Sequence, residues 1–192
     1  LYNMSKFTFT PFLSQAISQR KGEVRMGEKI KAFDSIQEAE FVILGISEDF
    51  GPQFNKGNPG AKMGFDSVIQ ALSNTQFNEF TNTINLGILG EIVQNTEFDP
   101  ADNCIPELDS LVQNTIDNFL TEDQTLIVIG GGHNNAYPII KHFAQKGKTH
   151  ALNIDPHADC RTTEERHSGN PFSSAIEDGS LASYSVFGLH ES

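Results

Sequence analysis

The strongest constraint on the fold is a unit that recurs along the chain: a short apolar run, a glycine-rich or polar turn, then an amphipathic stretch. The apolar runs lie at residues 41–46, 83–89, 125–131, 149–155 and 184–189. Those at 41–46 (FVILGI) and 125–131 (TLIVIGG) are almost continuously apolar, which is typical of strands buried on both faces of a sheet. Strands that alternate with helices predict an α/β fold with a mainly parallel sheet.

The helices are predicted between these runs. Apolar residues recur at helical spacing in residues 64–74, 106–120 and 135–147. Pro106 suits the first turn of the second helix, and Gly147 is a natural stop for the third. Working groups in such folds gather beyond the carboxyl ends of the strands, so the turns after residues 131 and 154 are the places to search.

The remaining organisation is simple. We expect a single domain over residues 1–192, with residues 1–35 as a less regular N-terminal extension that wraps it. His142, which adjoins Lys141 in the third helical segment, is expected to face solvent.

Composition excludes several classes of partner. The net charge of −12 argues against nucleic acid and anionic membranes, which need clustered Lys and Arg. The sequence holds no 18-residue apolar run that would predict a membrane-spanning helix. The two cysteines, Cys104 and Cys160, form no CxxC pair, which favours a cytoplasmic location over a disulfide framework.

The first polar segment of interest is GGGHNN, residues 130–135, directly after an apolar run. Its glycines let the backbone approach a site closely and present His133 at a strand end. The sequence has no GxxxxGK[ST] or GxGxxG motif, so a nucleotide-binding loop is not indicated. Taken alone, His133 is more typical of a structural histidine.

The second segment places Asp155, His157 and Asp159 at alternate positions behind the run at 149–155. In extended backbone such residues point to one side, where two unpaired carboxylates would repel each other. A divalent cation would remove that penalty, and mixed carboxylate and imidazole ligands suit Mn, Fe, Zn or Co, with Mn favoured where oxygen dominates. The alternative is a loop whose aspartates cap a helix. His133, expected nearby in the same parallel sheet, favours the metal.

Together, GGGHNN and NIDPHADCR (153–161) resemble the paired motifs of the ureohydrolases, the family of arginases, agmatinases and formiminoglutamases. Residues 55–72 (NKGNPGAKMGFDSVIQAL) and 167–179 (HSGNPFSSAIEDG) resemble two further family segments. The resemblance implies a three-layer αβα, arginase-like fold, and homo-oligomers. It also implies two Mn²⁺ ions that activate water to attack the planar carbon of a small amidine or guanidino substrate.

The resemblance also implies roles for particular residues. Carried over position by position, the metal ligands would be His133, Asp155, His157 and Asp159. Asp155 and Asp159 would be the catalytic pair: Asp155 bridging the two ions, and Asp159 also holding the attacking water.

One departure from the arginase pattern bears on the substrate. Arg161 stands two residues after Asp159, where arginases have Asn and formiminoglutamases tend to have Arg. A guanidinium group clamps a carboxylate through two hydrogen bonds, so it favours N-formimino-glutamate over the cationic agmatine. The alternative is a structural ion pair of Arg161 with Glu164 or Glu165.

A second departure concerns proton transfer. Ser168 and Asn170 match the S-G-N of the family and would contact substrate by resemblance; otherwise they are ordinary turn residues. Phe172 stands where arginases carry a proton-shuttling His, and His167 is the candidate substitute.

The family completes its metal site with two aspartates in a D-x-D-x-x-D-P motif, which this sequence lacks. We therefore expect the chain to be part of a ureohydrolase, inactive alone and a weak Mn²⁺ binder. Formiminoglutamase is the favoured activity, with arginase or agmatinase as alternatives. A non-catalytic metal-binding or scaffold protein is the alternative from another class.

Overall fold

A computed structural model describes residues 5–14 and 22–190 of the chain. The strands are β1 (Phe7–Pro11), β2 (Phe41–Ser47), β3 (Leu86–Gln94), β4 (Thr125–Ile129), β5 (Thr149–Ile154) and β6 (Leu181–Phe187). The helices are α1 (Phe50–Phe54), α2 (Gly64–Asn74), α3 (Ile105–Phe119), α4 (Ala136–Ala144) and α5 (Pro171–Glu177). Every apolar run expected to form a strand does so, although β3 and β6 are displaced along the chain from the runs. No helix in the described ranges is both long and apolar enough to cross a membrane.

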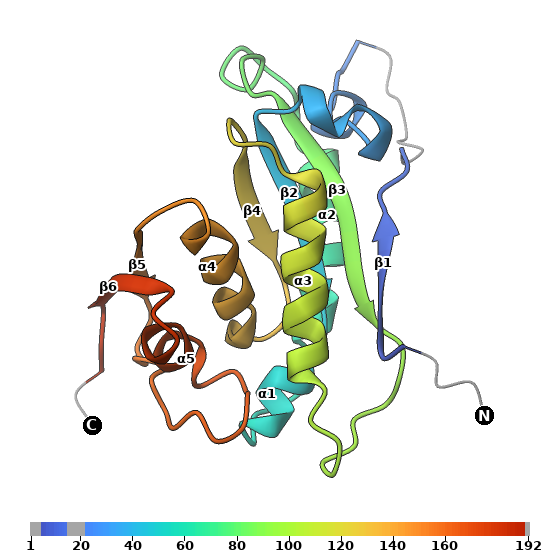
Figure 1. Cartoon of the computed structure of the whole chain (residues 1–192). Coiled ribbons are helices and arrows are strands. Elements are labelled where there is room, and N and C mark those ends of the chain that lie inside the picture. The colour runs from blue at the N-terminus through green and yellow to red at the C-terminus, as the bar shows by residue number, and fades with distance from the viewer. Residues whose placement is uncertain (1–4, 15–21, 191–192) are drawn as a thin grey trace.

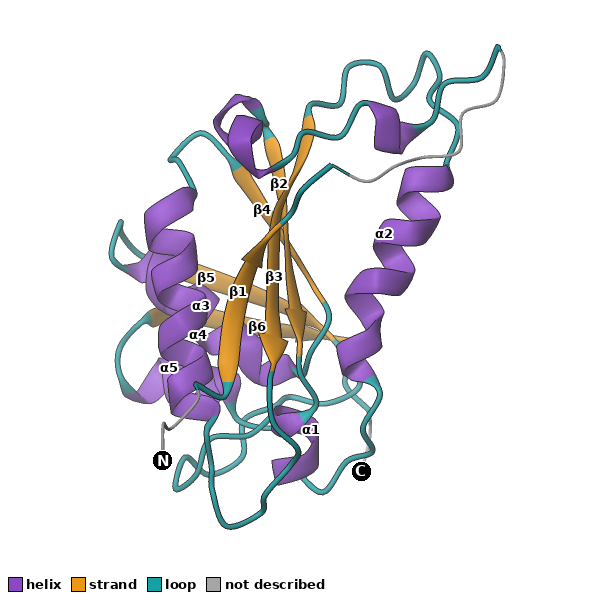
Figure 2. Ribbon diagram, turned by 90° about the vertical axis from the view of Figure 1, so that its right-hand side faces the viewer, coloured by secondary structure: helices purple, strands orange, loops and turns teal. Residues whose placement is uncertain are grey.

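The larger sheet has four strands in the order β1-β3-β2-β4. The pairs β2–β3 and β2–β4 are parallel, and β1 adds an antiparallel edge to β3. Helix α2 covers one face of this sheet and α3 the other, so the predicted three-layer αβα architecture is confirmed (Figures 1 and 2).

Strand β2 explains why both faces need a helix. Its side chains alternate, so Leu44 and Ile46 pack in the cluster beneath α3 while Ile43 packs in the cluster beneath α2. All three are at most 3% exposed. Burial of each such side chain favours the folded state by about 1.5–3 kcal/mol.

The N-terminal segment contributes to the core rather than only wrapping it. In β1, Phe7 is 2% exposed and meets Phe50 of α1 edge-on, with ring centroids 5.6 Å apart. The single-domain division over residues 1–192, with its extension at 1–35, stays a prediction.

The smaller sheet pairs β5 with β6 in parallel, and α4 and α5 pack beside it. The expectation that residues 125–131 and 149–155 belong to one sheet was wrong, because β4 and β5 lie in different sheets of the described chain. The open edges leave apolar side chains exposed: Ile127 is 39%, Leu152 66% and Ile154 74% accessible. Strand β2 is therefore buried on both faces, as expected, whereas β4 is only partly buried.

A second expectation also fails. His142 does not face solvent: its residue is 3% exposed, and its Nδ1 pairs with Asp117 of α3. The reason is that α4 turns this face toward α3.

The close approach of α2 to β2 yields a stability prediction. Gly45 faces the ring of Phe65, and an added Cβ would lie 2.5 Å from that ring. Gly45→Ala should therefore lower the free energy of unfolding by about 1–3 kcal/mol, the usual effect of overpacking.

The matched control is Gly64→Ala at the start of α2. There φ is −64°, and the new Cβ would meet its nearest atom at an ordinary 3.6 Å. This variant should gain about 0.4–1 kcal/mol through the unfolded state. Urea unfolding of both variants checks the pair, and equal stabilities would contradict the packing described.

Candidate metal centre

The glycine-rich turn after β4 presents His133. Gly130 and Gly131 have φ values of +90° and +72°, a region that side chains other than glycine rarely adopt. A Cβ on Gly131 would also lie 2.7 Å from both the Ile46 carbonyl oxygen and the Asn135 amide nitrogen. The turn therefore needs glycine for its conformation and for space. His133 opens a short 3-10 turn that leads into α4.

The loop after β5 supplies the carboxylates. Asp159 has φ +43°, a left-handed conformation that Asp tolerates better than most residues. Neighbouring side chains hold the loop: the Asn153 amide donates to the His157 carbonyl at 3.1 Å, and the Tyr184 hydroxyl donates to the Ala158 carbonyl at 2.6 Å.

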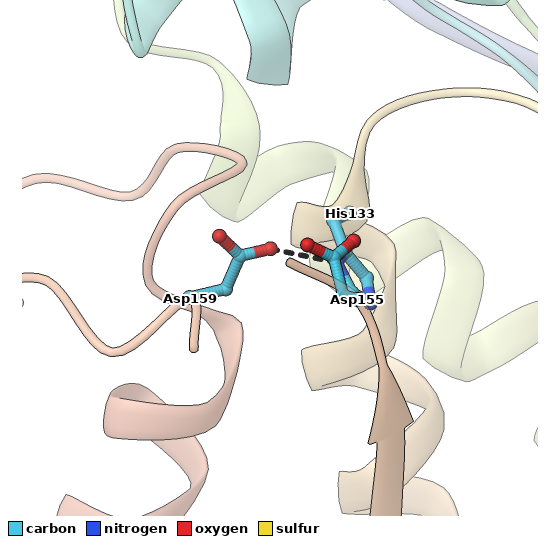
Figure 3. Close-up of side chains that lie close together, drawn as sticks. All are labelled: His133, Asp155 and Asp159. Atoms are coloured by element: carbon cyan, nitrogen blue, oxygen red, sulfur yellow. Dashed lines mark hydrogen bonds and ion pairs between the residues drawn. The ribbon is translucent and has the colours of Figure 1, made fainter. Parts of the chain in front are cut away.

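The two loops meet in one cluster of His133, Asp155 and Asp159 (Figure 3). His133 Nδ1 lies 2.6 Å from Asp159 Oδ2 and 3.9 Å from Asp155 Oδ2. Each residue offers one ligand atom, and all of these atoms lie within 4.8 Å of one another. The sequence predicts that His133, Asp155, His157 and Asp159 converge, and three of these four side chains do so, although the strands before them lie in different sheets.

The donor set fits a divalent metal ion. Two carboxylates and one imidazole give an oxygen-rich set, which suits Mn²⁺. The three side chains are 16–35% exposed, so an ion could reach them from solvent. A bound cation would also offset the repulsion between Asp155 and Asp159.

His157 lies outside this cluster. Its side chain is 75% exposed and its Nδ1 lies 3.1 Å from Asp155 Oδ1. Its backbone N–H donates to that same oxygen at 2.7 Å. The segment at 155–159 is therefore a loop rather than continuous extended backbone, and alternation does not bring all three side chains together.

A cavity of about 620 Å³ adjoins the cluster. Its lining includes Asn55, His157, Asp159, Arg161 and His190. Asp159 belongs to both the cluster and the cavity, which places any metal ion at the cavity wall.

Arg161 is exposed toward this cavity. Among the described residues, it forms no ion pair with Glu164 or Glu165. The purely structural role left open from the sequence has no support in this geometry.

The S-G-N turn, Ser168 to Asn170, lies beside the cavity, but not every side chain of this turn is accessible from it. Asn170 is fully buried, and its side chain bonds to Thr162, Glu165, Arg166 and His167. Ser168 accepts a 3.2 Å hydrogen bond from Asn55. This geometry gives Asn170 a structural position at the start of α5, while Ser168 lies next to a residue of the cavity wall.

Phe172 packs against the candidate ligand His133. The rings meet edge-on with centroids 5.3 Å apart, and Phe172 stacks on Tyr184 at 4.3 Å. His167, the candidate proton carrier, accepts a 3.0 Å hydrogen bond from the Gly169 N–H at its Nδ1. Nδ1 of His167 is therefore already engaged in a hydrogen bond within the turn.

Two residues of the site region were missed from the sequence. Asn55 lines the cavity. It is the first residue of the segment 55–72, whose resemblance to the family could have pointed to it. Arg166 is partly buried, with its side chain 12% exposed; it pairs with Asp109 of α3 at 3.0 Å and donates to the Asn134 carbonyl at 3.0 Å. No sequence pattern singled out Arg166.

Comparison with known proteins identifies the family. The arginase family model matches residues 39–192. The chain belongs to the arginase family. It is 30% identical over 168 residues to a formimidoylglutamase of Rhodococcus jostii, a match that covers 82% of this chain and 50% of that protein. A formimidoylglutamase of Salmonella newport is 30% identical over 140 residues, covering 69% and 41%. The chain thus spans about half the length of the relatives it matches.

Solved structures of this family share the fold. Formiminoglutamase of Trypanosoma cruzi with Mn²⁺ superposes with a TM-score of 0.72 at 23% identity, covering 87% of this chain and 58% of that one. Formimidoylglutamase of Bacillus subtilis gives a TM-score of 0.68 at 20% identity, covering 86% and 52%. The predicted arginase-like fold is confirmed.

The environment of His167 predicts a pH effect on stability. Burial lowers the pKa of His167 below 6.5, and the charges of Arg161 and Arg166 act in the same direction, while Asp159 and Glu165 oppose it. The unfolded chain therefore binds a proton before the folded chain does, so stability falls as the pH drops below about 6.5.

The replacement His167→Asn should remove this contribution. The free energy of unfolding of the wild type relative to the variant should be higher at about pH 8 than at about pH 5. Urea unfolding of both proteins at the two pH values measures it, and a difference that is independent of pH would contradict the assignment.

Proposed function

We propose that the protein to which this chain belongs hydrolyses N-formimino-glutamate to glutamate and formamide with Mn²⁺. One observation carries the proposal: Asp159, which forms a cluster with His133 and Asp155, lines the same cavity as Arg161. A candidate metal ligand and a cationic side chain thus border one cavity, which suits an acidic amidine substrate.

The metal would supply a nucleophile at neutral pH, because a bound divalent ion lowers the pKa of water. His133, Asp155 and Asp159 would hold the metal, with His157 as a further proposed ligand that must rotate inward from its exposed position. Asp159, which lines the cavity, is proposed to accept a hydrogen bond from the attacking water and so to orient it.

The reaction consumes one water. The water oxygen bonds to the amidine carbon, and the bond from that carbon to the glutamate nitrogen breaks. The nitrogen takes a proton and leaves as the amine of glutamate, while the former amidine carbon becomes the carbonyl carbon of formamide. The water supplies both protons that the products need: one passes to the departing glutamate nitrogen, and the other to the imino nitrogen, which becomes the NH₂ group of formamide. Asp155 and Asp159 are the proposed carriers of these protons.

Arg161 supports an acidic substrate. Arg161 is exposed, lines the cavity and has no carboxylate partner among the described residues. It could bind a substrate carboxylate through two hydrogen bonds, and it would repel the cationic agmatine. Ser168, through Asn55, is a proposed contact at the same wall; the contact proposed for Asn170 would require its buried amide to be released.

The names of the relatives support the same direction. The Rhodococcus and Salmonella proteins are formimidoylglutamases, and the Trypanosoma structure contains Mn²⁺. A homo-oligomeric state and a cytoplasmic location complete the proposal, the first from the family resemblance and the second from the cysteine content.

A parallel assay tests the proposal. The intact protein, loaded with Mn²⁺, should hydrolyse formiminoglutamate faster than arginine or agmatine. Arg161→Met should raise KM for formiminoglutamate about tenfold or more with a smaller change in kcat, since a hydrogen bond to a charged group contributes about 1.5–3 kcal/mol. Lys148→Met, at an exposed lysine before β5, is the matched control and should behave as wild type.

The outcomes separate the alternatives. Activity on agmatine alone would contradict the role of Arg161. Preference for arginine would favour the arginase alternative. Absence of turnover by a protein that binds Mn²⁺ would favour the non-catalytic scaffold.

A further inference from the structure

Glu48 is a fully buried carboxylate that no part of the reaction uses. It lies between β2 and α1 and does not line the cavity. Its Oε1 accepts hydrogen bonds from the Gly132 N–H at 2.7 Å and the Asn135 side-chain amide at 3.0 Å. Its Oε2 accepts a hydrogen bond from the Gly51 N–H at 2.8 Å.

These donors explain how a carboxylate can be buried there. The first N–H groups of a helical segment have no partner within it, and they attract negative charge. Gly51 lies in the first turn of α1, and Gly132 immediately precedes the 3-10 turn that leads into α4. One carboxylate therefore joins the starts of two helical segments that are far apart in the sequence.

The contacts of Asn135 close the same turn. Its side-chain amide donates to Glu48 and also to the Gly132 carbonyl at 2.9 Å. Both backbone hydrogen-bonding groups of Gly132, the residue before His133, are thus tied to Glu48: the N–H directly, and the carbonyl through the Asn135 side chain.

We propose that Glu48 is the positioning residue for His133. The direction of the His133 side chain depends on the backbone at Gly132, which Glu48 holds. Displacement of the ring by about 1 Å would break its 2.6 Å contact with Asp159, and functional groups must be held to within about 0.5 Å to work. The role in metal binding rests on the proposed function, whereas the His133–Asp159 contact is present in the chain itself.

Glu48→Gln tests the proposal with little change in volume. A glutamine places an NH₂ group where one carboxylate oxygen accepts a hydrogen bond, so the N–H of either Gly132 or Gly51 loses its acceptor. Two readouts apply. The ring-nitrogen NMR signal of His133 in the metal-free chain reports its contact with Asp159. The free Mn²⁺ signal in electron paramagnetic resonance reports metal affinity.

We expect the His133 signal to shift and broaden in Glu48→Gln. We also expect the affinity for Mn²⁺ to fall about 10–100-fold, the usual loss when residues that orient a metal ligand are replaced. Asn135→Ala, which leaves Glu48 in place but removes one of its donors, should act in the same direction with smaller effect. This second variant decides the question if Glu48→Gln does not fold.

Gln124→Ala is the matched control. Gln124 is also buried, at 8% exposure, and donates to the carbonyls of Ile36 and Ala39, but it precedes β4 at the end away from His133. This variant should lose stability and keep the wild-type His133 signal and affinity.

A His133 signal in Glu48→Gln and Asn135→Ala that matches Gln124→Ala would overturn the proposal. If wild-type chain shows no Mn²⁺ binding, the metal assignment fails, and the metal-free NMR comparison still decides the role of Glu48.

Discussion

The contact between His133 and Asp159 is the interaction on which the candidate site depends. The two residues follow β4 and β5, which lie in different sheets of the described chain, so no sheet hydrogen bonds set their separation. Their approach is instead determined by loops and by the packing of α3, α4 and α5. A change in that packing would open the cluster even if every ligand remained.

Polar contacts of Arg166 hold helices α3, α4 and α5 together. Arg166 binds Asp109 of α3, the Asn134 carbonyl before α4 and the Asn170 side chain at the start of α5, and it lies over the Tyr137 ring. Burial raises the pKa of Asp109 to about 6, although the adjacent Arg166 opposes this shift. Such a network is costly to break, because one partner removed leaves a buried charge unpaired. The bond from Arg166 to the Asn134 carbonyl also holds the turn that carries His133.

Sequence patterns predicted the parts of the fold that depend on local periodicity. Helix α2 was predicted at its observed bounds, and the apolar run at 41–46 predicted β2. The displacement of β4 from β5 could not be predicted, since period and polarity say nothing about which strands pair. The exposed Leu152 and Ile154 show the same limit: an apolar run indicates a strand suited to burial, not that a partner covers it.

The site divides in the same way. Spacing and resemblance identified His133, Asp155 and Asp159, which converge. The resemblance and the alternation also group His157 with them, but alternation assumes extended backbone. The hydrogen bond from the His157 N–H to the Asp155 side chain closes a turn there and breaks that assumption. Glu48 and Arg166 escaped notice because their partners are mostly backbone groups and side chains distant in sequence, which no single-sequence pattern encodes.

Anomalous diffraction at the manganese edge, from crystals of the chain soaked in Mn²⁺, would locate the metal. We expect a peak in contact with His133, Asp155 and Asp159, at the wall of the cavity that contains Arg161. A peak elsewhere, or none at these three residues under conditions where the wild-type fold is retained, would show that this cluster is not a metal site.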